Sequence, residues 1–426
     1  MNLKFLVLSL SVAICLPLSA THPRQEIAAN PYLAAANYLS YPEPTGVTLA
    51  QAPKGYKPFH ISTYMRHGSR YLIKYGEYDF SLNILQKADS AGVLTAKGKD
   101  VLDKVRRVRE KSVGRLGELT EVGRAQHRGI ARRMYSNFPE IFADSTVVNA
   151  TSTDVIRCIM SMMAECMELK AANPKLDIVH DASQADMHKL NNWQYDNARR
   201  KPYETSISIE SGRQKGALKP DRIFAELFTD PEWVNDNISD KKGWMYMLYY
   251  VAGNMQSHSD KSLDFMDLFT TGELYDLWKC TNVEWYCHGA NSPASGNRMH
   301  FGQTNLYEDI LNDGDAFAAS RKKGATLRFG HESVVLPTAV FFDLNGAGYS
   351  TDDLDRLDDH WVNYRIFPMA ANIQFVFYEK PGNDVLVRVL LNEHDATLPL
   401  KAVSNYFYRW DDVSEYFRKK LESAKK

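Results

Sequence analysis

Residues 59–71 read FHISTYMRHGSRY, and this stretch joins a strand to a cluster of charged side chains. Its first part, residues 59–65, alternates apolar and polar side chains as a short β-strand does. Its second part places His67 between Arg66 and Arg70, with Gly68 directly after the histidine. Open α/β sheets bind ligands beyond the carboxyl ends of their strands, so this order predicts an anion site at the edge of such a sheet.

Two more segments repeat the order of a strand followed by a helix. Residues 145–153 (STVVNATST) and 325–330 (ATLRFG) are strand-like, and helical patterns follow them at 154–169 and 333–344. This alternation predicts an α/β fold with a central, mostly parallel sheet flanked by helices.

The remaining elements are predicted with the same rules. Helices are expected near 80–111, at 120–135 with Thr120 as N-cap, and at the C-terminus from residue 412. Residues 372–379 and 385–393 form a predicted hairpin around the turn KPGND. In the helix at 154–169, the stripe of Ile156, Met160, Met163 and Met167 is expected to face the core.

The segment 181–300 differs in character from the rest of the chain. Strand patterns are missing from it, and Trp, Tyr, Asn, Asp and Lys are dense, which predicts an inserted α-helical cap domain. The α/β core then consists of residues 21–180 and 301–426.

The first twenty residues have the composition of a secretory signal peptide. Lys4 precedes a long apolar run that ends in PLSA, so cleavage is expected after Ala20. The run is too short for a stable membrane span. We therefore expect export, to the periplasm or the outside of the cell.

Export permits disulfides among the four cysteines that follow the leader. Cys158 and Cys166 lie too far apart on a helix to bond to each other. Cys280 and Cys287 can pair only if their segment turns back on itself, and free buried thiols are the alternative.

The overall composition is that of an ordinary globular protein. Hydrophobic residues make up 44% and charged residues 24%, and the formal net charge is -1. This balance argues against nucleic acid or an anionic membrane as partner, so any anion binding must come from local clustering. Nothing in the sequence indicates an oligomeric state.

Charged side chains follow all three predicted parallel strands. Arg66, His67 and Arg70 follow the first, Arg157 follows the second, and His331 and Glu332 follow the third. The motif at residues 66–70 favours a functional site even by itself, whereas Arg157 alone is better explained by a salt bridge and the His331–Glu332 pair alone by a structural contact. Their common position at strand ends predicts that they meet in one pocket.

Such a pocket fits a phosphoryl group. Three guanidiniums match its oxygens, and the positive charge keeps His67 neutral and able to attack phosphorus. A covalent phosphohistidine would result, with the arginines and His331 stabilising the charge and Glu332 donating a proton to the leaving group. Gly68 is expected to let the backbone approach the phosphate. The scheme requires no metal or other cofactor.

These motifs resemble the histidine acid phosphatases, a branch of the histidine phosphatase superfamily that includes phytases. The family's Arg-His-Gly-x-Arg motif is matched at residues 66–70, its Leu-Thr-x-x-Gly-x-x-Gln helix at 119–126, and its third arginine by Arg157. The family's distal histidine with an acidic donor is matched by His331 and Glu332. The resemblance covers the chain from about residue 30 to the C-terminal hairpin.

The subfamily is less sharply defined. Tyr71 resembles the tyrosine that follows the motif in the multiple inositol polyphosphate phosphatases. Many other members of the histidine acid phosphatase family have proline at the position of Leu72. The distal HES (331–333) matches neither the His-Asp of most phytases nor the His-Ala-Glu of the inositol polyphosphate enzymes. The resemblance implies Glu332 as the donor.

A basic rim would suit a polyphosphorylated substrate. The candidates are Lys74, directly behind the motif, and Arg199, Arg200 and Arg213 in the predicted cap. Solvated surface charge is an equally good explanation for each cap residue. His127, His288 and His394 show no metal-ligand pairing and are expected to be structural.

Together these features predict an exported phosphomonoesterase for a small-molecule substrate, with inositol polyphosphates as the leading class. One alternative is a broad acid or sugar-phosphate phosphatase. Another is a binding protein for phosphorylated polyols that has lost turnover. A role like that of phosphoglycerate mutases fits less well with a signal peptide and a large cap.

Overall fold

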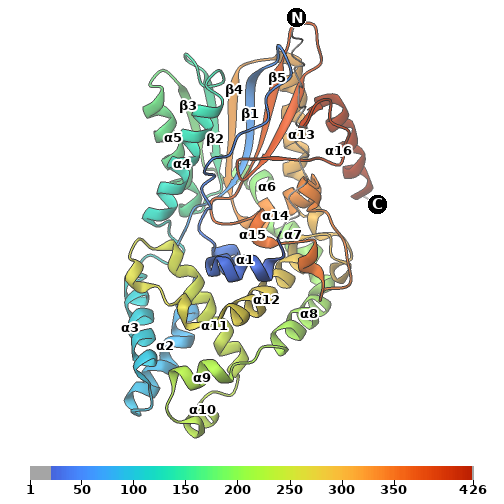
Figure 1. Ribbon diagram of the computed structural model, residues 1–426. Coiled ribbons are helices and arrows are strands. Elements are labelled where there is room, and N and C mark those ends of the chain that lie inside the picture. Colours follow the sequence, from blue (N-terminus) through green and yellow to red (C-terminus); the bar gives the residue numbers. More distant parts are fainter. Residues whose placement is uncertain (1–20, 425–426) are drawn as a thin grey trace, which may run out of the picture.

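The structure is a computed structural model that describes residues 21–424, so the expected signal peptide lies outside the described residues. Eight strands form one sheet in the order β3-β2-β4-β1-β5-β6-β7, and β8 pairs with β6. This sheet occupies the upper half of Figure 1. The strands are β1 (Lys57–Arg66), β2 (Val147–Ser152), β3 (Asp177–Asp181), β4 (Gly324–Gly330), β5 (Asn372–Glu379), β6 (Leu386–Leu391), β7 (His394–Ala396) and β8 (Phe407–Arg409).

The central strands are parallel, as predicted. β1 pairs with β4, β4 with β2, and β2 with β3, all parallel, whereas β5 is antiparallel to β1 and forms the expected hairpin with β6. The register places Arg66 opposite Gly330 and Ser152 opposite Phe329. The residues that follow β1, β2 and β4 therefore emerge at the same level of the sheet.

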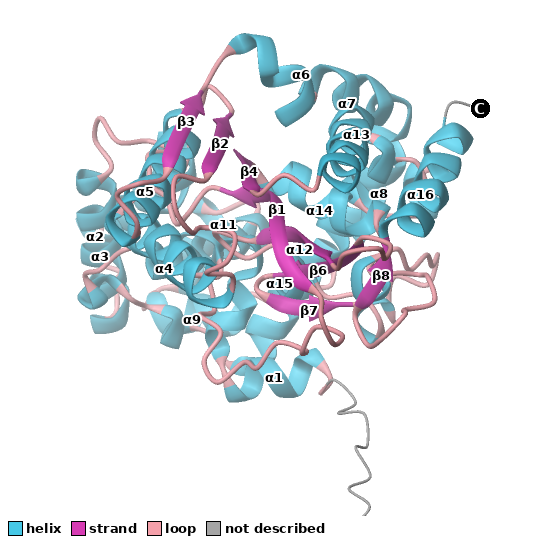
Figure 2. Ribbon diagram, turned by 90° about the horizontal axis from the view of Figure 1, so that it is seen from above, coloured by secondary structure: helices cyan, strands magenta, loops and turns pink. Residues whose placement is uncertain are grey.

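Helices cover both faces of the sheet (Figure 2). α4 (Glu121–Asn137) and α5 (Ile156–Ala172) lie on one face, where Met65, Leu327 and Met162 share an apolar cluster. α13 (Thr304–Ser320), α14 (Glu332–Phe341) and α16 (Trp410–Ala424) lie on the other, around Tyr64 and Phe341. Successive residues of β1 thus contribute to two different cores, as the twofold alternation of a strand requires.

The lower half of Figure 1 is helical and has its own core, with Trp244 and Trp278 at its centre. Leu85 and Val101, from helices before residue 181, belong to the same core. The segment 181–300 therefore does not form this core alone, and the domain boundaries stay a prediction. The helices not yet named are α1 (Pro23–Ala29), α2 (Tyr75–Ser90), α3 (Ala96–Lys111), α6 (Met187–Leu190), α7 (Trp193–Arg200), α8 (Glu204–Gly216), α9 (Asp221–Leu227), α10 (Pro231–Asn237), α11 (Lys241–Asn254), α12 (Thr271–Gly289) and α15 (Asn363–Ile366).

The predicted methionine core stripe on α5 is wrong. Ile156 is 61% and Met167 is 66% exposed, whereas Cys158, Met162 and Cys166 are buried. The face that packs against α4 and the sheet carries Met162, Cys166 and Leu169, so the predicted stripe on the other side of the helix lies toward the surface.

The structure also answers the questions of the possible disulfide between Cys280 and Cys287 and of the predicted N-cap at Thr120. Cys280 and Cys287 lie on the single helix α12, and all four described cysteines are free and buried. Thr120 is the N-cap of α4, with its hydroxyl accepting a hydrogen bond from the Gly123 amide. Among residues 21–424, no helix is long and apolar enough to cross a membrane.

Candidate active site

The candidate nucleophile is fixed by backbone hydrogen bonds at the end of β1. The amide of His67 donates to the carbonyl oxygen of Gly330 at 2.9 Å, and the amide of Arg66 donates to that of Ala371 at 2.7 Å. Strands β4 and β5 therefore hold this segment from both sides. Arg66 and His67 are completely buried.

The loop after His67 rests on the start of α4. A Cβ on Gly68 would lie 2.5 Å from the Gly123 carbonyl oxygen, and a Cβ on Gly123 would lie 2.3 Å from that of Ser69. Gln126 accepts from the Ser69 amide at 2.9 Å, and the Thr120 amide donates to the Ser69 carbonyl oxygen at 2.9 Å. Gly68 is thus required because a side chain at this position would collide with the backbone of α4. The reason predicted from the sequence was a different one, the approach of a phosphate to the backbone.

We expect Gly123→Ala to lower the free energy of unfolding by about 1–3 kcal/mol, since the added methyl group meets backbone atoms that cannot move aside. Chemical denaturation measures this change. Gly212→Ala in α8 is the matched control, because its Cβ would meet nothing within 4 Å. There the helix should gain about 0.5–1 kcal/mol. Equal effects of the two substitutions would contradict the proposed close contact.

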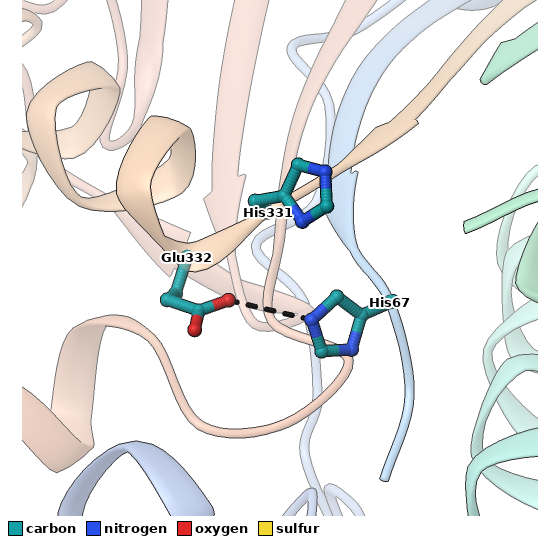
Figure 3. Close-up of side chains that lie close together, drawn as sticks. All are labelled: His67, His331 and Glu332. Atoms are coloured by element: carbon teal, nitrogen blue, oxygen red, sulfur yellow. Dashed lines mark ion pairs between the residues drawn. The ribbon is translucent and has the colours of Figure 1, made fainter. Parts of the chain in front are cut away.

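The two ring nitrogens of His67 have different surroundings. Nδ1 lies 2.9 Å from the Gly68 carbonyl oxygen, which can only accept, so Nδ1 carries the hydrogen. Nε2 then has a free lone pair and points to the Glu332 carboxylate, 3.4 Å away (Figure 3). The same carboxylate oxygen lies 3.1 Å from Arg66 Nε.

The electrostatics of the pocket favour a neutral histidine beside an ionised glutamate. Burial, with the charges of Arg157 and Arg66, holds the pKa of His67 well below its usual value. Burial alone would raise the pKa of Glu332, but the charges of Arg66 and Arg70 lower it well below its usual range. The predicted neutral state of the nucleophile agrees with this direction.

His331 forms a second wall of the pocket. Its Nδ1 lies 3.4 Å from Arg157 Nη2, and its Nε2 lies 3.3 Å from the Thr153 hydroxyl. Burial, followed by the charge of Arg157, lowers the pKa of His331 to about 3. In the absence of a bound anion the imidazole is therefore neutral near pH 7 and acts as a dipole.

Arg70 completes the cluster. One of its Nη atoms donates to the Tyr71 carbonyl oxygen at 2.9 Å, and its guanidinium lies 5.3 Å from the ring centroid of Tyr38. Its charge acts on Arg157 and on Glu332. The structure thus brings together all six residues that the sequence assigned to the strand ends.

Several nitrogens of this cluster are buried without a hydrogen-bond partner, which is rare in folded proteins. They are Arg66 Nε and Nη2, His67 Nε2, Arg70 Nε and Arg157 Nε. Four of these atoms are guanidinium donors, of which Arg66 Nε is ion-paired with Glu332, so an anion with several oxygens would satisfy the others. The chemistry of the donor set therefore fits a phosphoryl group.

One ligand atom from each of His67, His331 and Glu332 lies within 4.8 Å of the others, a spacing that could hold a metal ion. Three arginines, at positions 66, 70 and 157, face the same space, however, and their charges oppose a cation. The donor set suits an anion better, and metal independence stays a prediction.

The cap arginines of the predicted basic rim contact neighbouring side chains. Arg213 pairs with Asp355 at 3.0 Å, and Arg200 pairs with Asp196 at 3.0 Å. Arg199 contacts the hydroxyl of Tyr195. Lys74 is exposed just before α2, four residues beyond Arg70. Acidic or polar groups thus engage the three cap arginines, and a role in substrate binding remains a prediction for all four residues.

The sequence assigned no role at the site to several side chains that lie beside the cluster, and it predicted a structural role for one of them, His127. Tyr38 contacts Arg70, and Thr153 contacts His331. His127 contacts the carbonyl oxygen of Arg66 and is itself paired with Glu165. Tyr38 and Glu165 come from segments with no motif of their own. For Thr153 and His127, the signal was their position next to the matched motifs.

Comparison with known families gives one match, to the family described as the histidine phosphatase superfamily (branch 2), over residues 60–392. No curated protein sequence matches the chain. Solved structures with the same fold include the multiple inositol polyphosphate phosphatase of Bifidobacterium longum in complex with phosphate. It is 18% identical, covers 91% of this chain and 98% of its own, and has a TM-score of 0.76.

Two further structures extend the comparison. The same Bifidobacterium longum enzyme in complex with inositol hexasulfate gives a TM-score of 0.70 at 18% identity, covering 90% of this chain and 97% of its own. The phytase from D. castellii gives 0.64 at 14% identity, covering 92% of this chain and 85% of its own. At these identities the likeness concerns the fold.

Proposed function

This chain belongs to the histidine phosphatase superfamily (branch 2) and is a phosphatase, and we propose that it hydrolyses inositol polyphosphates through a phosphohistidine on His67. We further propose that it works without a metal ion and is exported. The observation that carries the proposal is the set of buried guanidinium nitrogens of Arg66, Arg70 and Arg157 that make no hydrogen bond, in the same cluster as His67.

The reaction takes two displacements. In the first, the lone pair of His67 Nε2 forms a bond to phosphorus, and the ester P–O bond breaks as its oxygen accepts a proton from the Glu332 carboxyl. In the second, water attacks phosphorus and gives a proton back to Glu332. The N–P bond breaks, and inorganic phosphate leaves.

The surrounding charges stabilise both steps. Arg66, Arg70 and Arg157 compensate the negative charge on the phosphoryl oxygens, and His331 contributes its ring dipole. The site is buried, so these interactions are stronger than they would be in water.

Inositol polyphosphates are the substrate class that several features support. The enzyme of Bifidobacterium longum with this fold binds inositol hexasulfate, and the fold is shared by the phytase from D. castellii. In this chain, Tyr71 and the exposed Lys74 follow the motif directly and suit a substrate with several phosphates.

Phosphate release from phytate tests the substrate class. We expect the enzyme to hydrolyse phytate with a kcat/KM at least about tenfold above that for glucose 1-phosphate, because only phytate offers further phosphates to surrounding cations. Chromatography of the intermediates follows the order of removal. Equal rates would instead indicate a broad acid phosphatase, and tight phytate binding without phosphate release would indicate a binding protein.

A further inference from the structure

A buried pair of titratable residues lies directly behind the nucleophile and takes no part in the reaction described above. His127 in α4 and Glu165 in α5 are both fully buried, and Nδ1 of the histidine lies 2.9 Å from a carboxylate oxygen of the glutamate. Nε2 of His127 lies 3.2 Å from the carbonyl oxygen of Arg66. The pair therefore links two helices to the last residue of β1.

The hydrogen positions follow from the partners. A carbonyl oxygen only accepts, so Nε2 of His127 carries a hydrogen and donates it to Arg66. Nδ1 and Glu165 then share one proton, and the pair has no net charge whichever of the two holds it. Burial raises the pKa of Glu165, and His127 offsets this only in part.

The carbonyl that His127 holds belongs to the peptide unit that joins Arg66 to His67. The N–H of the same unit is the amide of His67, which donates to Gly330 at 2.9 Å. A peptide unit is planar, so fixing both of its polar atoms fixes the orientation of the plane. Together with the rotation about the N–Cα bond of His67, that plane sets the direction in which the His67 side chain leaves the backbone.

We propose that His127 and Glu165 are positioning residues, which orient the Arg66–His67 peptide so that Nε2 of His67 faces the phosphate. This inference rests on the proposed function. A shift of about 1 Å in a reacting group can cost roughly 100-fold in rate. The carbonyl oxygens of Asn37 and Phe367 hold the Arg66 guanidinium separately, and Arg70 and Arg157 are not part of this peptide, so substrate binding depends less on the pair.

The test replaces both partners together, as His127→Leu with Glu165→Leu. Exchanging both members for apolar residues of similar size leaves neither side chain unpaired and is often tolerated, while the carbonyl oxygen of Arg66 loses its donor, which is the contact under test. We expect the first-turnover release of p-nitrophenol from p-nitrophenyl phosphate to slow by about 10- to 100-fold. The inhibition constant of inorganic phosphate should change by less than about threefold, since the arginines remain.

Glu165→Gln is the conservative counterpart. Its amide can donate to Nδ1 of His127 and leaves the donor to Arg66 in place, so the rate should stay within about threefold of wild type. A folded double variant with the wild-type first-turnover rate would overturn the proposal.

If the double variant does not fold, the single variant His127→Leu is measured in the same way, because Glu165 can remain protonated. Loss of folding in both would assign the pair a purely structural role and would equally overturn the proposal. Wild-type enzyme is assayed alongside. A lack of phosphatase activity in wild type would refute the proposed function instead.

Discussion

His67→Ala is expected to lower the turnover of p-nitrophenyl phosphate by about 10⁴-fold or more, because it removes the atom that forms the covalent intermediate. The fold should survive the change. The side chain makes a single short hydrogen bond, from Nδ1 to the carbonyl oxygen of its own neighbour Gly68. The measurement is steady-state turnover, together with acid-quench trapping of labelled phosphoenzyme, which the variant should not form.

His60→Ala is the matched control for this prediction. His60 is a buried histidine on the same strand, stacked on Phe317 with ring centroids 3.6 Å apart, and it lies at the other end of β1. Its loss should cost stability and leave the turnover of the folded enzyme nearly unchanged. A His67→Ala enzyme with half of the wild-type rate would end the proposed mechanism.

The convergence of the strand ends could be predicted from the sequence because parallel strands end at the same edge of a sheet. The register of β1, β4 and β2 then brings the following residues to one level without further information. For this reason Arg66, Arg157 and His331 meet, although more than 90 residues separate each from the next. The rule needs only the strands and their order.

The orientation of a helix about its own axis was harder to predict. On α5 the stripe that contains Met160 and the face that contains Cys158 both repeat at helical spacing. Which face turns inward depends on how closely α4 approaches, and this is a property of both helices. Hydrophobicity favoured the methionine stripe, whereas the face that packs inward carries Met162 and Leu169 together with two cysteines.

Long-range contacts within the helical part were also beyond local reasoning. The sequence placed a cap at 181–300, but α2 and α3 share its core through Leu85 and Val101. For the same reason, local charge patterns could not indicate that Arg213 pairs with Asp355, 142 positions away in the chain.

Glu332→Gln is expected to slow the hydrolysis of alkyl phosphates by about 10²- to 10⁴-fold, because glutamine has no proton to give to the leaving alkoxide. Aryl phosphates such as p-nitrophenyl phosphate should lose far less, since p-nitrophenolate leaves without protonation. Steady-state rates on both ester types provide the comparison, with the aryl ester as internal control. Equal losses would identify another group as the acid.

The position of Glu332 also predicts how binding depends on pH. In the free pocket its pKa is well below the usual range, because the charges of Arg66 and Arg70 outweigh the effect of burial. A bound anion adds negative charge beside the carboxylate and compensates the arginines, so the pKa of Glu332 rises and the carboxyl takes up a proton. Binding therefore supplies the proton that the first displacement uses.

Inositol hexasulfate tests this coupling, because its charge does not change between about pH 4 and 8. Its affinity should fall as the pH rises through the range between the two pKa values of Glu332, by up to about tenfold per pH unit for one proton. His67 and His331 also face the carboxyl and can take up protons, whereas Arg66, Arg70 and Arg157 stay charged. In Glu332→Gln the slope should vanish if the carboxyl is the group that titrates. An unchanged slope would assign the proton to a histidine, and Glu332 would then have to obtain its proton in some other way.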